Sequence, residues 1–387
     1  MPIINRIAEF TDEIVGWRRD FHAHPETLYD VQRTAARVAE LLRSFGVDEV
    51  VEGIGRIGVV GVIRGRGPGK AIGLRADMDA LPITEQTGRP YASQTPGKMH
   101  ACGHDGHMAM LLGAAKYLAE TRNFAGSAVL IFQPAEEGGA GGKAMVEDGL
   151  MERFGIDEVY GLHNMPGMTK GSFGMRVGGI MAASDRFDIT IEGKGGHAAR
   201  PQHGVDPVVM AAQLITTLQT LVSRNTDPMR AAVLSVTMFH AGDAFNIIPQ
   251  KVELTGTVRT LDEAVRDLIE TRLKAVTVGL VETLGGKAAV SYRRGYPVTV
   301  NTAAQVDYAA RIAGEVSGAE RVDANADPSM AGEDFSYMLQ ARPGAFVFLG
   351  TGDGPDLHSD TYDFNDEVIP EGVSYWVKLV EGSPAAA

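Results

Sequence analysis

The sequence predicts an α/β protein in which a smaller α+β domain is inserted into a larger one. The chain has 387 residues, which is long for a single hydrophobic core. Short apolar segments typical of buried strands alternate with helical segments over residues 1–184 and again over 295–387. Between them, over residues 185–294, the elements follow the order β-α-β-β-α-β, which indicates a ferredoxin-like two-layer sandwich.

The N-terminal region is expected to be helical. Apolar residues recur at helical spacing over residues 4–21, and Pro25 stops this helix. A second helix is expected over residues 31–45. His22 and His24 are possible metal ligands, but their place at a helix end beside a proline favours a structural role.

Strands follow, and several of them lead into polar groups. Residues 50–64 have the composition of a strand segment. Three further segments are 71–75, followed by Asp77 and Asp79; 128–132, followed by Glu136 and Glu137; and 159–162, followed by His163. Charged groups at the end of a buried strand are costly unless something positive meets them. In an open α/β sheet this end of the strands is where ligands bind, so one shared site is expected.

One short stretch concentrates metal-binding side chains. Residues 99–107 hold three histidines and a cysteine, in a chain that has 10 histidines and a single cysteine. Thiolate and imidazole are the ligands that zinc and related metals prefer. Gly103 separates Cys102 from His104 and allows a tight turn. Each residue alone is compatible with a buried cysteine or a helix cap, but the cluster favours a metal site on the loop that enters the next helix.

The inserted domain begins at about residue 185. Its expected elements are a strand at 187–193, a helix at 207–222, strands at 233–239 and 252–259, a helix at 263–284 and a strand at 288–293. From residue 302 the α/β pattern resumes with a helix at 303–316 and a strand at 345–350, which leads to His358. A final helix is expected within residues 364–381.

Composition excludes some classes of partner. The chain has 36 basic and 49 acidic residues and a net charge of −13, which argues against nucleic acid or an anionic membrane as partner. A single cysteine cannot form an internal disulfide. No apolar run is long enough to span a bilayer, and the first residues lack the features of a signal peptide. A cytoplasmic location is therefore expected.

The strand ends and the cluster together supply a complete set of metal donors. The set is Cys102, His104, Glu137, His163 and His358. Five donors exceed what one four-coordinate zinc needs, but they fit two ions that share a bridging thiolate, with Cys102 as the bridge. Glu136 is left over beside Glu137, and a free carboxylate next to activated water is suited to act as general base.

These residues resemble the aminoacylase-type metallohydrolases, in the branch that contains hippurate hydrolases and plant indoleacetyl-amino-acid hydrolases. The matching motifs are RADMDALP (75–82), MHACGHDGH (99–107), QPAEEG (133–138), GLH (161–163), GGHA (195–198), NIIP (246–249) and GEDF (332–335). They follow one another along nearly the whole chain. The resemblance implies a di-zinc-peptidase-like catalytic domain over 1–184 and 295–387, with a lid and dimerisation domain over 185–294. It also implies hydrolysis of N-acyl-amino acids to a carboxylic acid and an amino acid.

The resemblance also implies roles for single residues. Glu136 is the base, the five donors hold two divalent ions, and Asp77 and Asp79 orient the ligands from behind. In the inserted domain His197 and Asn246 contact substrate, and in relatives the histidine reaches the active site of the opposite subunit. A homodimer, or a tetramer built from such dimers, is therefore expected.

Two departures from the family pattern bear on selectivity. In wider aminoacylase relatives the bridge is an aspartate, and a histidine stands at the position of Asp77. Here Cys102 bridges and His104 takes over, which leaves zinc, manganese and nickel all open. Residues 25–30 depart from the commoner Pro-Glu-Leu-Gly-Phe pattern, which leaves the acyl preference open.

Two rival functions stay open at this stage. A di-metal dipeptidase or aminopeptidase on the same scaffold would recognise a free amine rather than an acyl group. A metal-binding or regulatory protein without catalysis would lack the base or a ligand, and none is missing here. His100, His107, His203 and His240 receive no role.

Overall fold

The structure is a computed structural model that describes residues 4–383. The chain divides into two compact units. Unit 1 comprises residues 4–180, 300–327 and 334–383, and unit 2 comprises residues 181–299 and 328–333. That the segments 1–184, 185–294 and 295–387 form separate domains stays a prediction.

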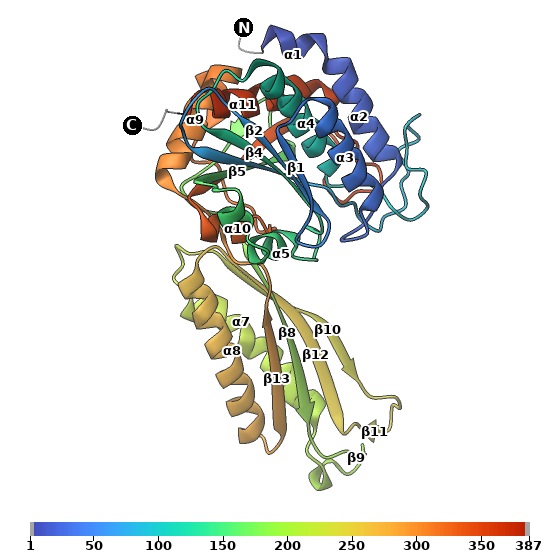
Figure 1. The fold of residues 1–387 in the computed structure, drawn as a ribbon. Helices are drawn as coiled ribbons and strands as arrows, with labels where there is room; N and C mark the ends of the chain where they lie inside the picture. The colour runs from blue at the N-terminus through green and yellow to red at the C-terminus, as the bar shows by residue number, and fades with distance from the viewer. Residues whose placement is uncertain (1–3, 384–387) are drawn as a thin grey trace. The chain divides into compact units, whose positions relative to one another are not determined.

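Unit 1 is built on an eight-stranded mixed sheet with the order β1-β2-β4-β3-β5-β16-β6-β15 (Figure 1). The strands are β1 (Glu49–Ile54), β2 (Gly58–Arg64), β3 (Ala71–Asp77), β4 (Ser127–Gln133), β5 (Glu158–Pro166), β6 (Phe173–Gly174), β15 (Val322–Asp323) and β16 (Gly344–Gly352). The four neighbours β4, β3, β5 and β16 run parallel to one another. Their almost continuous burial explains the unbroken apolar runs in the sequence.

Helices pack around this sheet. They are α1 (Asn5–Glu9), α2 (Thr11–Ala23), α3 (Gln32–Ser44), α4 (His104–Thr121), α5 (Gly141–Glu147), α6 (Leu150–Arg153), α9 (Ala303–Ser317), α10 (Ser336–Ala341) and α11 (Ile369–Glu381). Helix α4 packs against β3, α2 and α11. It is buried on nearly every side, because a helix that is apolar all round belongs in a core.

Two predicted elements of unit 1 are each divided in the structure. The helix expected over residues 4–21 is broken at Phe10, which leaves the helical conformation while its side chain stays buried. The segment 50–64 is an antiparallel hairpin of β1 and β2 rather than one strand. Its turn has positive φ angles at Gly55 and Arg56, and a Cβ at Gly55 would lie 2.6 Å from the backbone of Met145. Composition alone does not reveal that a contact with Met145, distant in sequence, restricts the residue at this turn to glycine.

Unit 2 has a four-stranded antiparallel sheet with the order β10-β12-β8-β13 (Figure 1). Its main elements are β8 (Ala183–Glu192), α7 (Pro207–Thr220), β10 (Ala232–Ala241), β12 (Lys251–Thr260), α8 (Glu263–Thr283) and β13 (Lys287–Arg294). This sequence of elements confirms the predicted β-α-β-β-α-β order. Asp206 and Asp262 cap the two helices by accepting backbone N–H groups.

Short elements complete the chain. They are β7 (Gly178–Met181), β9 (Gly196–His197), β11 (Ile247–Ile248), β14 (Thr299–Asn301), a π-helix (Leu221–Asn225) and 3₁₀ turns at Pro201–His203, Ala319–Arg321 and Asp366–Val368. Within residues 4–383, no helix combines the length and the apolarity needed to cross a bilayer.

Candidate metal centre

The parallel strands of unit 1 bring the predicted donors to one edge of the sheet. Asp77 ends β3, His163 lies near the end of β5, and His358 follows β16. Glu136 and Glu137 follow β4. Since neighbouring parallel strands present their carboxyl ends at the same edge, residues far apart in sequence become neighbours here. Helix α4 packs on β3 and begins at His104, and Cys102 lies in the loop just before it. This segment therefore adds two further donors to the same edge.

The five predicted ligands lie together in two groups that share Cys102. The donor atoms of Cys102, His104 and His163 lie within 4.8 Å of one another, and so do those of Cys102, Glu137 and His358. Cys102 Sγ is 3.5 Å from His163 Nε2, and His358 Nε2 is 3.4 Å from Glu137 Oε1. This is the arrangement that two ions with one bridging thiolate require.

Backbone carbonyls orient two of the imidazoles. His104 Nδ1 is 2.7 Å from the carbonyl oxygen of Asp79, and His163 Nδ1 is 2.7 Å from that of Asn164. A carbonyl only accepts, so each Nδ1 carries a proton, and in the neutral form of either ring the lone pair is on Nε2. Among the described residues, the buried atom His104 Nε2 has no hydrogen-bond partner. Lone pairs turned inward beside a carboxylate and a thiol fit a divalent metal ion.

The ionisation of the donors also suits a cation. Burial lowers the pKa of His163 to about 3, so its ring stays neutral. Against the effect of burial, hydrogen bonding to His358 and the charge of His104 hold the pKa of Glu137 below its ordinary value. Burial, reinforced by the carboxylates of Glu137 and Glu136, raises the pKa of Cys102 well above that of a free thiol. A metal cation that replaces the thiol proton would therefore reduce the electrostatic repulsion among these acidic groups.

Asp79 holds residues of the site in place through hydrogen bonds. Its carboxylate accepts the backbone N–H groups of Glu136 at 2.9 Å and Glu137 at 3.1 Å, while its carbonyl accepts from His104. Burial raises the pKa of this carboxyl well above its ordinary value. Asp79 thereby contacts three residues of the cluster at once, and its role in orienting metal ligands stays a prediction.

Asp77 lies nearer to the donors. Arg75 donates to Asp77 Oδ2 at 2.8 Å, and His104 Nε2 is 3.5 Å from the same oxygen. Burial opposes ionisation, but the positive charges of His104, Arg75 and His107 lower the pKa of Asp77 well below its ordinary value. Asp77 is thus a buried carboxylate that faces His104 and is held by an arginine.

His107 is a functional residue that the sequence analysis left without a role. Its Nδ1 is 2.6 Å from Asp77 Oδ1, and its Nε2 is 2.6 Å from Asn164 Oδ1. Both ring nitrogens have close partners, so His107 links Asp77 with Asn164, and one of these nitrogens also lies within 4.8 Å of donor atoms of Asp77 and His104. Its position three residues after His104 on one helix face was the signal that could have found it.

At Gly103, with φ +89°, a Cβ would lie 2.3 Å from Asn164 Oδ1, so only glycine fits there.

Glu136 lies beside the donors without belonging to either group of ligands. The carboxylate is 7% exposed, and one of its oxygens lies within 4.8 Å of donor atoms of His104 and Glu137. Ala135 before it has a positive φ of 54°, which turns the loop sharply after β4. Glu136 therefore combines burial with access to the donor cluster.

The N-terminal histidines make structural contacts. His22 Nδ1 is 2.8 Å from Asp105 Oδ2 and its Nε2 is 3.3 Å from Glu85 Oε1. His24 Nδ1 donates to the carbonyl of Asp20 at 2.8 Å. These contacts agree with the structural role favoured for both residues.

His197 and Asn246 are neighbours in unit 2. The two-stranded ladder of β9 and β11 pairs His197 with Ile247, and the N–H of Ala198 donates to the carbonyl of Asn246 at 3.0 Å. The backbone N–H of Ala199 donates to His197 Nδ1 at 3.1 Å. In the neutral ring the proton therefore lies on Nε2, which becomes a hydrogen-bond donor.

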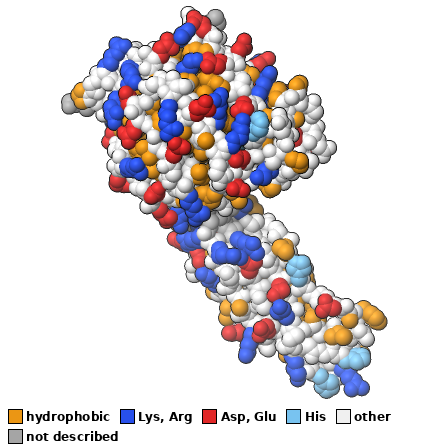
Figure 2. All heavy atoms as spheres, turned by 45° about the vertical axis from the view of Figure 1, so that its right-hand side comes forward, with side chains coloured by type: hydrophobic (Ala, Val, Ile, Leu, Met, Phe, Trp, Pro, Cys, Tyr) orange, Lys and Arg blue, Asp and Glu red, His pale blue; other side chains and the backbone are white. Residues whose placement is uncertain are grey.

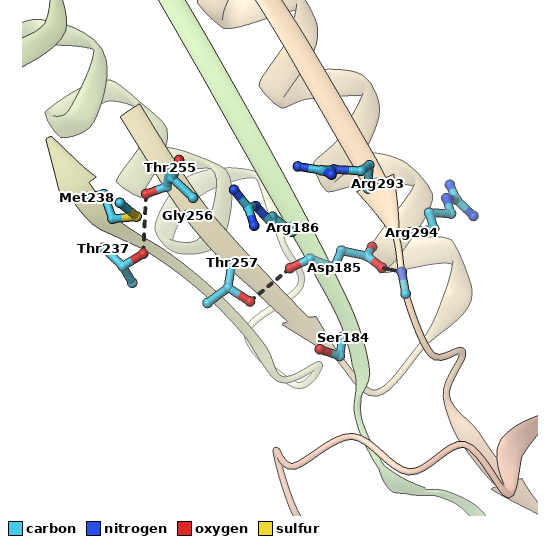
Figure 3. A pocket seen from close by; sticks show the side chains of 11 residues that line it. Ser184, Asp185, Arg186, Thr237, Met238, Thr255, Gly256, Thr257, Arg293 and Arg294 are labelled. Carbon is cyan, nitrogen blue, oxygen red and sulfur yellow. Dashed lines mark hydrogen bonds between the residues drawn. The ribbon is translucent and has the colours of Figure 1, made fainter. Parts of the chain in front are cut away.

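Unit 2 also has a hollow of about 430 Å³ on its sheet (Figure 3). It is lined by Ser184, Asp185, Arg186, Thr237, Met238, Thr255, Gly256, Thr257, Arg293, Arg294 and Gly295. Arg186 and Arg293 both contact Asp188, and Thr257 donates to the carbonyl of Asp185 at 2.8 Å. None of the predicted site residues lines this hollow.

The fold and the site define an α/β protein with a dinuclear type of donor set at the carboxyl edge of its sheet. The chain belongs to peptidase family M20/M25/M40, whose model matches residues 73–382. It is 43% identical to the hippurate hydrolase of Campylobacter jejuni over 98% of both chains. It is also 43% identical to the N-acetyl-L-cysteine deacetylase of Bacillus subtilis, over 92% of this chain and 85% of that one.

A solved structure gives the same result for the fold. The YxeP protein of Bacillus subtilis, a dinuclear metal binding peptidase from the M20 family, matches with a TM-score of 0.86 and 32% identity. The match covers 97% of this chain and 98% of that one. The predicted resemblance and the predicted fold class are confirmed.

Proposed function

We propose that this protein is a metal-dependent amidohydrolase that cleaves the amide bond of N-acyl-amino acids. The observation that carries the proposal is the group of five metal donors with the spare carboxylate of Glu136 beside it. Hippurate and N-acetyl-L-cysteine, which two relatives are named for, are both N-acyl-amino acids. The products are a carboxylic acid and a free amino acid.

The proposed cofactor is a pair of divalent metal ions. Two divalent ions (zinc, manganese or nickel) would be held by Cys102, His104, Glu137, His163 and His358, with Cys102 shared. When bound, such ions polarise a carbonyl group and lower the pKa of water. The backbone carbonyls that accept from His104 and His163 keep both rings in the tautomer that can bind.

Glu136 is the proposed proton carrier. Its carboxylate takes a proton from water as the water oxygen attacks the acyl carbon. The same carboxyl group then gives this proton to the nitrogen, the C–N bond breaks, and the amino acid leaves as a neutral amine. Asp79 holds the backbone of Glu136 through its N–H group, so the carboxylate stays in place during both transfers.

His197 is proposed to act on the charge that develops at the acyl oxygen. An exposed imidazole with a proton on Nε2 is a suitable donor to an oxyanion. Asn246, its neighbour on β11, is proposed to contact the substrate. We infer that His197 serves the site of a second subunit, as the resemblance implies.

The proposed partner is therefore a second copy of the chain. Strand β10 lies at the edge of the sheet of unit 2 and exposes Val233, Met238 and Phe239. An unpaired edge with apolar side chains favours pairing with another strand. Phe245 and Ile247, on either side of Asn246, are also exposed, and Figure 2 shows hydrophobic side chains and histidines on the surface of this unit.

A substrate panel tests the proposal. The purified protein is freed of metal, reloaded with zinc, manganese or nickel, and assayed on hippurate, N-acetyl-L-cysteine and a dipeptide with a free amine. Hydrolysis of the acylated substrates that requires metal is expected. A clear preference for the dipeptide would overturn the proposal in favour of a peptidase.

A further inference from the structure

Two segments that carry or flank the metal donors meet at one buried arginine. Arg18 on α2 is fully buried. Its NH1 is 3.3 Å from Asp105 Oδ2 and 3.2 Å from Asp363 Oδ1, and its Nε is 2.8 Å from Asp366 Oδ1. Asp105 directly follows the proposed ligand His104 on α4. The other two carboxylates lie after β16, on the segment 353–366 that contains His358.

Each of these carboxylates has a second cation of its own. His22 contacts Asp105 at 2.8 Å, Arg89 Nε is 3.0 Å from Asp363, and Arg19 is 2.9 Å from Asp366. These partners each hold a single carboxylate in the contacts above, whereas Arg18 contacts all three. Arg18 is therefore the connection between α4 and the segment after β16, rather than only a counter-charge.

The segment with His358 needs such a connection more than His163 or His104 does. His163 lies within a strand of the sheet and His104 within a helix, whereas His358 lies in a loop with a positive φ of 64°. A non-glycine residue keeps that conformation only where its surroundings impose it. The surroundings here are the hydrogen bond from His358 N to Ala101 O at 2.8 Å, the contact of Gln86 with Asp360, and the carboxylates held by Arg18.

We propose that Arg18 is a positioning residue for the metal centre. By holding Asp105, Asp363 and Asp366 at once, it fixes His358 relative to the segment of Cys102 and His104, so that both groups of donors share Cys102. The inference rests on the proposed function only in requiring that the five donors bind metal. Arg18 touches neither metal nor substrate.

Metal titration tests this role directly. The metal-free protein is titrated with Zn²⁺ alone in the presence of a competing chelator, and the wild type is expected to bind two equivalents. In Arg18→Met the Kd of one equivalent, the one that His358 would bind, should rise by about 10- to 100-fold, as for other residues that support metal ligands. Arg18→Lys keeps the charge but cannot reach three carboxylates, so it should show a smaller rise.

Arg19→Met is the matched control. Arg19 is the next residue on the same helix, its side chain is 46% exposed, and it pairs with Asp366. Its removal should change both Kd values by less than about threefold, because exposed ion pairs contribute little. If Arg18→Met does not fold, Asp363→Asn cuts the same connection at a partly exposed position and should weaken the same equivalent.

The outcomes separate this inference from the proposed function. A folded Arg18→Met or Asp363→Asn protein that binds both equivalents as the wild type does would overturn the role of Arg18. Equal weakening of both equivalents would overturn it too, since Arg18 would then support the whole core. Failure of the wild type to bind two equivalents would instead count against the proposed function.

Discussion

His163 in unit 1 and His197 in unit 2 are both held by the backbone at Nδ1, but in opposite senses. At His163 a carbonyl accepts from Nδ1, so the lone pair is on Nε2. At His197 an N–H group donates to Nδ1, so the proton is on Nε2. One buried ring can thus offer a lone pair to a metal ion, and one exposed ring can offer a hydrogen bond. A single backbone contact decides which chemistry an imidazole can offer.

The two surroundings reinforce this difference. His163 lies among buried carboxylates, a thiol and other histidines, and burial keeps it neutral. His197 lies on a short exposed ladder next to apolar side chains. We therefore propose that unit 1 holds the metal donors, while unit 2 offers exposed groups to a second subunit. The following variants test that division.

Glu136→Gln should have the largest effect, because it removes the proton carrier of unit 1 and leaves the metal donors untouched. The amide keeps size and hydrogen bonding but cannot take a proton. We expect kcat to fall at least about a hundredfold and up to about 10⁴-fold, with metal content unchanged. Steady-state kinetics together with metal analysis measure both. If the variant loses metal instead, Glu136 is itself a ligand.

His197→Ala should lower kcat by about a hundredfold, with metal content again unchanged, because one donor to the oxyanion is lost. A ligand variant such as His163→Ala should lose metal as well, which is the contrast between the two rings. Loss of metal from the His197 variant would contradict the division into two roles.

Mixing Glu136→Gln and His197→Ala subunits tests whether His197 acts across a dimer. Each mixed dimer would contain one site with both a good base and a good histidine. Activity should return to at most about half of the wild-type value per mixed dimer. Subunit exchange must be demonstrated separately, for example with two affinity tags. Proven exchange without recovered activity would place His197 within its own subunit or outside catalysis.

Cys102→Ser should weaken the centre of unit 1 without abolishing the fold. A serine hydroxyl does not ionise as a thiol does, so the Kd of at least one ion should rise by at least about tenfold. Thiol reagents should inactivate the metal-free protein and spare the loaded one. Equal protection in both states would show that Cys102 is an ordinary buried residue.

The sequence predicted which side chains come together at the donor cluster, but it did not predict the contacts that hold them. Cys102 and His104 are close in sequence, and Glu137, His163 and His358 could be found because each follows an apolar strand. Such strands run parallel in an α/β sheet, so their ends meet. The parallel order of β4, β3, β5 and β16 in the structure bears out that reasoning.

The contacts that support the donors could not be predicted from the sequence, for a physical reason. His107 binds Asp77 and Asn164, and Arg18 binds Asp105 and Asp363, over long stretches of chain. No periodicity or spacing relates such pairs, because they are created by packing of separate elements. The hairpin turn at Gly55 was missed for the same reason, since Met145 sets the space available there.

His22 gives the smallest effect and a third kind of buried histidine. Burial opposes its protonation, but the hydrogen bonds with Asp105 and Glu85 prevail and raise its pKa to about 9, from an ordinary value of 6.5. His22 is thus charged where His163 is neutral. Because the folded pKa exceeds the unfolded one, its stabilisation is fully present below pH 6.5 and is lost as the pH rises through 9.

The pH dependence of unfolding measures this contribution. The shift of pKa corresponds to about 3 kcal/mol of the free energy of unfolding. His22→Gln should therefore be less stable than the wild type at pH 6, and the difference should shrink as the pH passes 9. Urea unfolding of both proteins at pH 6, 7.5 and 9.5 gives the comparison. A difference that stays constant over this range would mean that His22 is neutral in the folded protein, and that its contacts with the two carboxylates act as ordinary hydrogen bonds.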